Sequence, residues 1–362
     1  MRKMTTPSPG KLSRPKTRTP WEETALLREL LGVPAPSGRE GALAGLVRRH
    51  LDGLGFAHET DGAGNVVVRL EGRHRRGPLC MLAAHMDEVG LVVTRIEEDG
   101  SLRVDRSGRV SPHKLGERPV VILGDFSTIT GVLSFGTGHS SADGIAWSEV
   151  RVITGLSVQA LRQAGVRPGS TGVPTPTGRE PTLLGDPANP LLAAWTLDDR
   201  AGVAVLLELL ARVKNEHLQP PFPTLIAFTV HEEGGCHGAK ILAHRERPEI
   251  FLAIDGCPWS PDSGIEVDDR PVAWSKDVLG HYDQKLVATL ARAARAAGTE
   301  LQVAVLANAC SDASAVYASG AAPRVGILGH ARYNSHGFEV ARWAVFSHIV
   351  ETLLHLWQDE NW

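Results

Sequence analysis

Acidic residues and histidines stand at several points where an apolar stretch of the chain ends. They are His85 and Asp87 after CMLAA, Glu232 and Glu233 after TLIAFTV, Asp255 after FLAI, and His336 after RVGIL. A further acidic residue, Asp198, comes shortly before the apolar stretch GVAVLLELLARV. Imidazole and carboxylate groups together suit divalent ions such as Zn²⁺, Co²⁺ or Mn²⁺. These residue types and positions therefore indicate a metal site.

Hydrolysis at a pair of metal ions needs a particular set of side chains. Two divalent ions roughly 3.5–4 Å apart need a bridging carboxylate, with a further His or carboxylate on each side. One more carboxylate that is not a ligand must take the proton from the attacking water. The adjacent Glu232 and Glu233 can supply one ligand and one base. Asp87 lies two residues from His85, which is a good spacing to hydrogen-bond the imidazole and set its tautomer.

Each of these residues taken alone also fits an ordinary structural role. A His-x-Asp after a strand is often a turn, a Glu-Glu pair is usually solvated, and an Asp that ends a strand commonly caps a helix. His336 is one of 15 histidines. The combination still favours a metal site, because unrelated surface residues need not follow apolar strands one after another.

The elements after Trp195 are predicted to alternate between helix and strand. The apolar spacing predicts helices at 202–213, 238–243, 285–297, 312–318 and 339–357, and strands at 224–230, 251–255, 301–306 and 324–328. Such alternation is typical of an α/β fold with a mainly parallel sheet covered by helices. Open sheets of this kind bind ligands at the carboxyl ends of their strands. The acidic residues and histidines are therefore expected to converge on one pocket.

The rest of the chain suggests a divided domain. Helices are predicted at 21–31 and from a capping box at Ser37–Glu40 to Leu51, with strands between 65 and 105. Between about 106 and 186, short strands alternate with Gly-, Ser- and Pro-rich links around one helix at 157–164. We therefore expect a catalytic α/β domain of residues 21–105 and 187–362, interrupted by a small β-rich domain at 106–186.

The composition bears on the binding partners and the cellular location of the protein. The formal net charge of the 362 residues is −3, which gives no global reason to expect nucleic-acid or membrane binding. The basic, Pro-rich first 20 residues lack the apolar core of a secretory signal and are expected to form a disordered tail. The four cysteines form no CxxC pair and are expected to be reduced thiols, which favours a cytoplasmic protein.

Several segments resemble the TET-type metallo-aminopeptidases, the family of glutamyl and deblocking aminopeptidases whose members have often been labelled endoglucanases. The segments are APSGRE (35–40), AAHMDEVGLVV (83–93), ALRQAGVRPGS (160–170), TLDDRAGVAVLLELL (196–210), HEEGGCHGA (231–239), AIDG (253–256), SDASAVYASG (311–320) and RYNSHGFEV (332–340). The resemblance implies a zinc-exopeptidase-like α/β domain with an inserted β-rich domain for dimerisation and assembly. It also implies a homo-oligomer built from dimers, up to a dodecamer.

The resemblance implies a role for each candidate residue and two divalent metal ions per subunit. His85 and Asp255 would bind the first metal ion, Glu233 and His336 the second, and Asp198 would bridge the two. Glu232 would be the general base that acts on a metal-bridging water, and Asp87 would orient His85. Two departures stand out: one extra residue separates Tyr333 from His336, and His231 precedes the Glu pair where Gln is common.

The predicted activity is removal of N-terminal residues from peptides, since a free substrate α-amine could bind one metal ion. One alternative is a dinuclear deacylase or carboxypeptidase that acts on N-acyl amino acids. Another is a glycosidase, which needs two carboxylates and no metal. A third is a metal-binding assembly protein that has lost catalysis, although the complete set of ligands and base argues against it.

Overall fold

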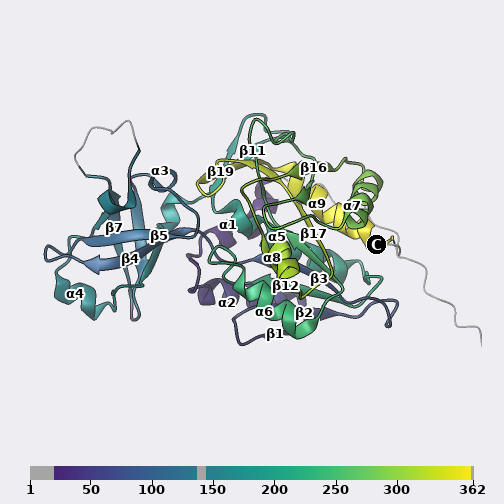
Figure 1. The fold of residues 1–362 in the computed structure, drawn as a ribbon, viewed down its shortest axis with the longest axis horizontal. Helices are drawn as coiled ribbons and strands as arrows, with labels where there is room; N and C mark the ends of the chain where they lie inside the picture. The colour runs from purple at the N-terminus through teal and green to yellow at the C-terminus, as the bar shows by residue number, and fades with distance from the viewer. Residues whose placement is uncertain (1–19, 137–143, 360–362) are drawn as a thin grey trace, which may run out of the picture.

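An eight-stranded mixed β-sheet forms the centre of the larger of two units in this computed structural model, which describes residues 20–136 and 144–359 (Figure 1). Its strands, in order across the sheet, are β1 (His58–Thr60), β2 (Val66–Leu70), β12 (Thr224–Thr229), β3 (Cys80–His85), β13 (Ile250–Ile254), β17 (Arg324–Gly329), β15 (Val272–Lys276) and β16 (Gln302–Val305). The four strands from β12 to β17 are parallel, and β2 and β15 flank them in antiparallel pairing.

The α/β class therefore agrees with the structure, whereas a mainly parallel sheet describes only its centre. The central strands are the apolar stretches that the sequence identifies, and β3, β12 and β13 are buried along their whole length. Burial on both faces is the usual environment of parallel strands, because helices cover the two sides. The flanking strands β1, β2 and β15 are shorter or partly exposed, and they join the sheet in antiparallel or mixed pairing.

Helices cover both faces of this sheet (Figure 1). One face packs against α1 (Pro20–Leu31), α2 (Gly41–Leu54), α5 (Leu197–Asn215), α7 (Gln284–Ala296) and α9 (Ala344–Leu356), and the other against α6 (His237–Glu246) and α8 (Asp312–Ala318). Within β12, Ile226 and Phe228 face the first layer, while Leu225 and Ala227 face the second. Burying a side chain such as Phe228 contributes about 1.5–3 kcal/mol to the free energy of unfolding.

A second sheet of five strands lies beside the first. Its order is β10 (Thr182–Leu184), β11 (Leu191–Trp195), β19 (Phe338–Arg342), β18 (Ala331–Tyr333) and β14 (Cys257–Pro258). The predicted helix at 339–357 is therefore wrong in its first residues, since 339–342 pair with β11 and α9 begins only at Ala344. Pairing with β11 decides the conformation here, because it satisfies the backbone of a segment whose buried Glu339 also finds polar partners.

The smaller unit is a closed barrel that stands at one side of the α/β unit (Figure 1). Its strands, in order around the barrel, are β4 (Gly90–Ile96), β5 (Leu102–Ser107), β8 (Arg151–Ile153), β7 (Thr128–Ser134), β6 (Pro119–Leu123) and β9 (Thr171–Pro174). The short helices α3 (Pro112–Leu115) and α4 (Val158–Gln163) and the 3₁₀ turns η1 (Trp147–Glu149) and η2 (Pro176–Gly178) accompany these strands. The barrel thus begins at Gly90 rather than near 106, because β4 pairs with both β5 and β9. Strand spacing is the same on either side of Gly90, so the sequence carries no sign of where the barrel starts.

The N-terminal part of the chain carries a predicted tail and a predicted capping box. The predicted tail of residues 1–20 lies outside the described residues, except that Pro20 begins α1. The predicted capping box before α2 is wrong, because the N-cap residue Glu40 makes no side-chain capping bond. The Glu40 carboxylate instead accepts the backbone N–H groups of Gly38 and His231, and Ser37 bonds to the predicted site.

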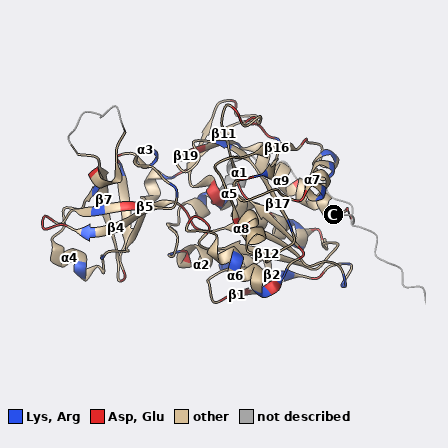
Figure 2. Cartoon of the chain, in the orientation of Figure 1, with Lys and Arg blue, Asp and Glu red and all other residues tan. Residues whose placement is uncertain are grey.

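Charged residues of both signs are dispersed along the ribbon of both units (Figure 2). Among the described helices, none combines the length and the apolar character needed to cross a membrane.

Candidate metal centre

The carboxyl ends of three neighbouring parallel strands bring four of the predicted residues together. His85 is the last residue of β3 and pairs in register with Thr229, the last residue of β12. Glu232 and Glu233 follow three and four residues later, and Asp255 comes directly after β13. Because β12, β3 and β13 are adjacent, their ends open onto the same edge of the sheet.

Asp198 lies between two histidines. Its Oδ1 is 3.3 Å from Nε2 of His85, and its Oδ2 is 3.5 Å from Nε2 of His336. The residue follows β11 at the start of α5, where its backbone has non-helical angles and the Asp198–Asp199 peptide is cis. The Asp198 N–H donates to Oε2 of Glu339 at 2.8 Å, which ties this turn to β19. A carboxylate with one oxygen toward each imidazole has the arrangement of a bridging ligand.

His336 reaches this centre from the turn between β18 and β19. Its Nε2 is 3.5 Å from Oε1 of Glu233, and its Nδ1 lies 2.7 Å from the backbone oxygen of Arg109. The contact with Arg109 leaves Nε2 as the nitrogen that faces the carboxylates. The nearby His330 packs instead against Phe346 with 5.0 Å between ring centroids, and burial lowers the pKa of His330 to about 3. The longer Arg332–His336 segment therefore still delivers one histidine to the site.

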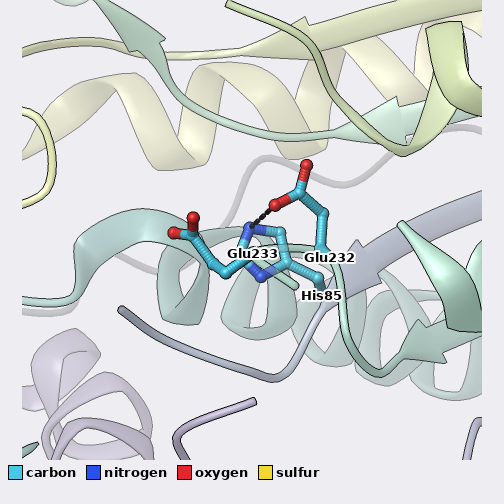
Figure 3. A group of neighbouring side chains, drawn as sticks. All are labelled: His85, Glu232 and Glu233. Carbon is cyan, nitrogen blue, oxygen red and sulfur yellow. Dashed lines mark ion pairs between the residues drawn. The ribbon is translucent and has the colours of Figure 1, made fainter. Parts of the chain in front are cut away.

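Glu232 and Glu233 approach the His85 ring from two sides (Figure 3). Oε2 of Glu232 is 3.9 Å from Nε2 of His85, and ligand atoms of all three residues lie within 4.8 Å of one another. Glu233 belongs also to the group with Asp198 and His336, whose ligand atoms satisfy the same limit. The two adjacent glutamates thus point to different parts of the same centre.

Asp87 fixes the backbone of this glutamate pair. Its Oδ1 accepts the N–H of Glu232 at 2.8 Å, and its Oδ2 accepts the N–H of Glu233 at 3.0 Å and the hydroxyl of Ser37 at 2.6 Å. Nδ1 of His85 lies 3.1 Å from the Asp87 backbone oxygen and 3.5 Å from its Oδ1. One fully buried carboxylate therefore orients both the imidazole and the two glutamates.

Asp255 and the neighbouring Asp199 occupy the inner side of the site. Ligand atoms of His85, Asp199 and Asp255 lie within 4.8 Å of one another, whereas Asp198 is not part of that group. Both carboxylate oxygens of Asp199 already accept hydrogen bonds. Oδ2 accepts the backbone N–H of His85 at 3.2 Å, and Oδ1 accepts the backbone N–H of Gly202 at 3.0 Å. Asp199 therefore fastens the start of α5 to the end of β3.

Arg332 is a cation at the centre to which the sequence assigns no function. Its Nη2 contacts Oδ2 of Asp198, and its Nε donates to Oε1 of Glu339 at 2.9 Å. Gly256, beside Asp255, has no side chain where the guanidinium lies, and an added Cβ would collide with Arg332 Nη1. Burial lowers the pKa of Arg332, but the carboxylates of Asp198 and Glu339 outweigh it and raise the pKa overall. Arg332 thus balances one part of a strongly acidic cluster of side chains.

Other buried carboxyl groups keep raised pKa values, although the imidazoles, and for Asp255 also Arg332, partly offset the effect of burial. Burial raises the pKa of Glu233 to about 7, with the Asp198 charge adding to the effect. Burial, with Asp198 again adding, raises the pKa of Asp255 to about 6. Burial together with the charges of Glu233, Asp255 and Asp312 raises the pKa of Glu232 well above its usual range. Crowded buried carboxylates beside two imidazoles are the donor set that divalent metal ions require, so the residues fit a metal centre.

A buried ion network supports the loop that carries His85 and Asp87. Oε1 and Oε2 of Glu88 each lie 2.7 Å from Nη2 of Arg179, and Oε1 also accepts from Arg200 at 3.1 Å. The Trp195 indole N–H donates to Oε2 of Glu88 at 2.9 Å. All four side chains are fully buried. The sequence shows HMDEVG as a motif, but the partners of Glu88 are far apart in the chain and could not be found from spacing.

Seen together, an α/β sheet with candidate metal ligands at its strand ends and an inserted barrel fit a metallohydrolase. The model of the M42 glutamyl aminopeptidase family matches residues 64–351. The chain belongs to this family and is a metal-dependent aminopeptidase.

Curated relatives and solved structures are consistent with this family assignment. The glutamyl aminopeptidase of Lactococcus lactis is 31% identical over 255 residues, which are 66% of this chain and 67% of that protein. The lysyl aminopeptidase of Pyrococcus furiosus is 30% identical over 243 residues, or 65% and 66% of the two chains. The TET1 peptidase of Pyrococcus horikoshii, which can assemble into a tetrahedron or a large octahedral shell, superimposes with a TM-score of 0.80 at 25% identity. That match covers 93% of this chain and 99% of the other.

Proposed function

We propose that this aminopeptidase works with two divalent metal ions held around Asp198. His85, Asp198 and Asp255 would hold one ion, and Asp198, Glu233 and His336 the other. The position of Asp198 carries the proposal, because its two oxygens face the two imidazoles at 3.3 and 3.5 Å. The first set would need Asp255 to turn toward Asp198, since Asp255 now groups with Asp199.

The donor set suits Zn²⁺, Co²⁺ or Mn²⁺, since it combines imidazole nitrogen with carboxylate oxygen. Such ions, when bound, lower the pKa of a water molecule and polarise the scissile carbonyl. Arg332 competes for one oxygen of Asp198, and its guanidinium would have to share that carboxylate.

Glu232 is the proposed general base. Its carboxylate lies near His85 Nε2 without belonging to the group of Asp198, Glu233 and His336. Oε of Glu232 would take a proton from the attacking water and return it to the leaving amine. Asp87 holds the backbone of Glu232 in place, so the carboxylate meets the substrate in a fixed position.

The proposed substrates are peptides with a free N-terminus, whose α-amine would bind at the same centre.

A homo-oligomer built from dimers, up to a dodecamer, is also proposed. The barrel would supply contacts, since Val132 and Ile153 form an exposed cross-strand pair and Phe126 is 82% exposed.

Metal stoichiometry tests this assignment. Asp198→Asn is expected to lose both ions, whereas His336→Ala and His85→Ala should each lose one and all three should lose aminopeptidase activity. His281→Ala, at an exposed histidine outside the site, is the matched control and should keep both. Two ions retained in Asp198→Asn would refute the bridging role.

A further inference from the structure

A further group of potential ligands includes Glu232, and the proposed mechanism does not use its other two members. Ligand atoms of Glu232, Cys236 and Asp312 all lie within 4.8 Å of one another. The Cys236 thiol is 3.5 Å from Oε1 of Glu232. Cys236 precedes α6 and Asp312 begins α8, the two helices that cover one face of the sheet. Separate elements therefore bring a thiol and two carboxylates to one point.

Asp312 contributes to this point a buried oxygen without a partner in the described part of the chain. The side chain is buried, and its Oδ2 accepts the Thr229 hydroxyl at 2.7 Å. Its Oδ1 is also buried and has no hydrogen-bond partner among the described residues. Burial of a carboxylate oxygen without a partner is unfavourable, so such an atom favours a bound group. Thr229 meanwhile keeps the free oxygen in a fixed orientation, as the outer partners of metal ligands do.

Only one imidazole of the described residues offsets the negative charge of these two carboxylates. In the described part of the chain, no Lys or Arg forms an ion pair with Asp312 or Glu232, and the one basic side chain near Glu232 is His85, at 3.9 Å. A second thiol, Cys310, interacts with the Cys236 thiol and is only half-buried. Cys310 does not belong to the group within 4.8 Å, and its partly exposed thiol lies next to Cys236 on a path to solvent.

We propose that Glu232, Cys236 and Asp312, with Cys310 at the entrance, form a third metal site that takes a thiophilic divalent ion such as Zn²⁺ or Cd²⁺. Thiolate ligands favour such ions, whereas the proposed dinuclear centre offers only imidazole and carboxylate groups. Binding would break the S–H bond of Cys236, form a metal–thiolate bond and release the proton to solvent. Because Glu232 would become a ligand, an ion bound here would inhibit peptide hydrolysis.

Spectroscopic titration with Co²⁺ tests the site directly. After two equivalents have bound, a third equivalent should produce thiolate-to-cobalt charge-transfer absorption in the wild-type protein. Cys236→Ser should bind two equivalents and show no such absorption, and Cys310→Ser should bind the third about 10–100-fold more weakly. Cys80→Ser, at a buried thiol elsewhere, should behave as the wild type. No charge-transfer absorption in the wild type, or the same absorption in Cys236→Ser, would overturn the proposal.

Inhibition by excess Cd²⁺ tests the third metal site and the role of Glu232 as general base separately. Only the inhibitory effect rests on the proposed role of Glu232, because the absorption measures binding alone. We expect Cd²⁺ to inhibit the wild type, and Cys236→Ser to need at least about 10-fold more Cd²⁺ for equal loss of its own rate. Charge-transfer absorption without inhibition would refute Glu232 as the base and leave the third site standing. A Cys236–Cys310 disulfide in the freshly purified protein, detected by mass spectrometry, would count against the site.

Discussion

Oδ1 of Asp87 accepts the backbone N–H of Glu232 at 2.8 Å, so the residue that orients His85 also places the proposed base. The second oxygen of Asp87 does the same for Glu233 at 3.0 Å. His85 and the glutamates belong to different strand ends, and Asp87 joins them. A change at this single carboxylate should therefore disturb a metal ligand and the base together.

Replacing Asp87 by Asn tests this coupling. An amide has one acceptor oxygen and an NH₂ group, so one of the two backbone N–H groups would face another donor. We expect Asp87→Asn to lower kcat by about 10-fold or more and to weaken metal binding by about 10–100-fold. Ser37→Ala removes only the hydroxyl bond to Asp87 and is the milder comparison. Wild-type kcat and metal affinity in Asp87→Asn would contradict the positioning role.

Arg332 should contribute more to the free energy of unfolding of the metal-free protein than to that of the metal-loaded protein. Without metal ions its guanidinium is the cation that contacts both Asp198 and Glu339. Removing one partner of a buried ion pair costs about 3–5 kcal/mol, so Arg332→Met should lower the free energy of unfolding by that amount in chelator. Bound metal ions would compensate Asp198 and reduce the loss. Denaturant unfolding with and without Zn²⁺ measures the difference, and equal losses in both states would contradict this account.

The metal-free protein should lose stability as the pH rises from about 5 to about 8. Burial raises the pKa of Glu233 from its ordinary value of 4.5 to about 7, so the folded chain holds a proton that the unfolded chain releases in this window. When the folded state binds more protons, the free energy of unfolding falls with rising pH. Thermal unfolding in chelator should show a smaller fall in Glu233→Gln than in the wild type. The same pH dependence in both proteins would show that Glu233 is not the source.

Metal binding, in contrast to stability, should become stronger as the pH rises. The ion needs ionised Glu233 and Asp255, whose pKa values of about 7 and 6 mean that protons must leave when it binds. Calorimetric titration with Zn²⁺ near pH 6, in buffers of different ionisation enthalpy, should therefore show proton release. Binding without proton release at that pH would contradict ligation by these carboxylates.

The exposed apolar residues of the barrel should govern assembly. Val132 and Ile153 pair on β7 and β8 and are 46% and 55% exposed. We expect Val132→Asp combined with Ile153→Lys to reduce the oligomer measured by light scattering, because charged groups oppose burial in an interface. Leu279→Asp, at a similarly exposed residue of the α/β unit, is the control. An unchanged oligomer in the barrel variant would place the contacts elsewhere.

The local sequence predicts the elements around the site better than it predicts their partners. The helices α5 to α8 and the strands β3, β12, β13 and β17 follow from apolar spacing, and the residues at their ends are those that converge. The five-stranded sheet is missed because its strands are short and come from distant parts of the chain. Helical and extended spacing could not be separated in FEVARWAVF, where pairing with β11 decides.

The spacing of residues in the sequence also does not predict which side chains contact each other across the fold. Arg332, Ser37 and Glu88 act through contacts with residues about 50 or more positions away in the chain. Ser37 is read as a helix cap because its neighbours fit that pattern, yet its hydroxyl bonds Asp87. Only the folded chain shows which of two local roles a polar residue takes.

Glu232→Gln provides the most direct test of the central claim, since the substitution keeps size and removes only the acid–base function. We predict that the purified variant retains two metal ions per subunit while hydrolysis of aminoacyl substrates falls by about 10²–10⁴-fold. Glu71→Gln, at an exposed glutamate outside the site, should leave both quantities unchanged. Activity near the wild-type rate in metal-loaded Glu232→Gln would show that Glu232 is not the general base.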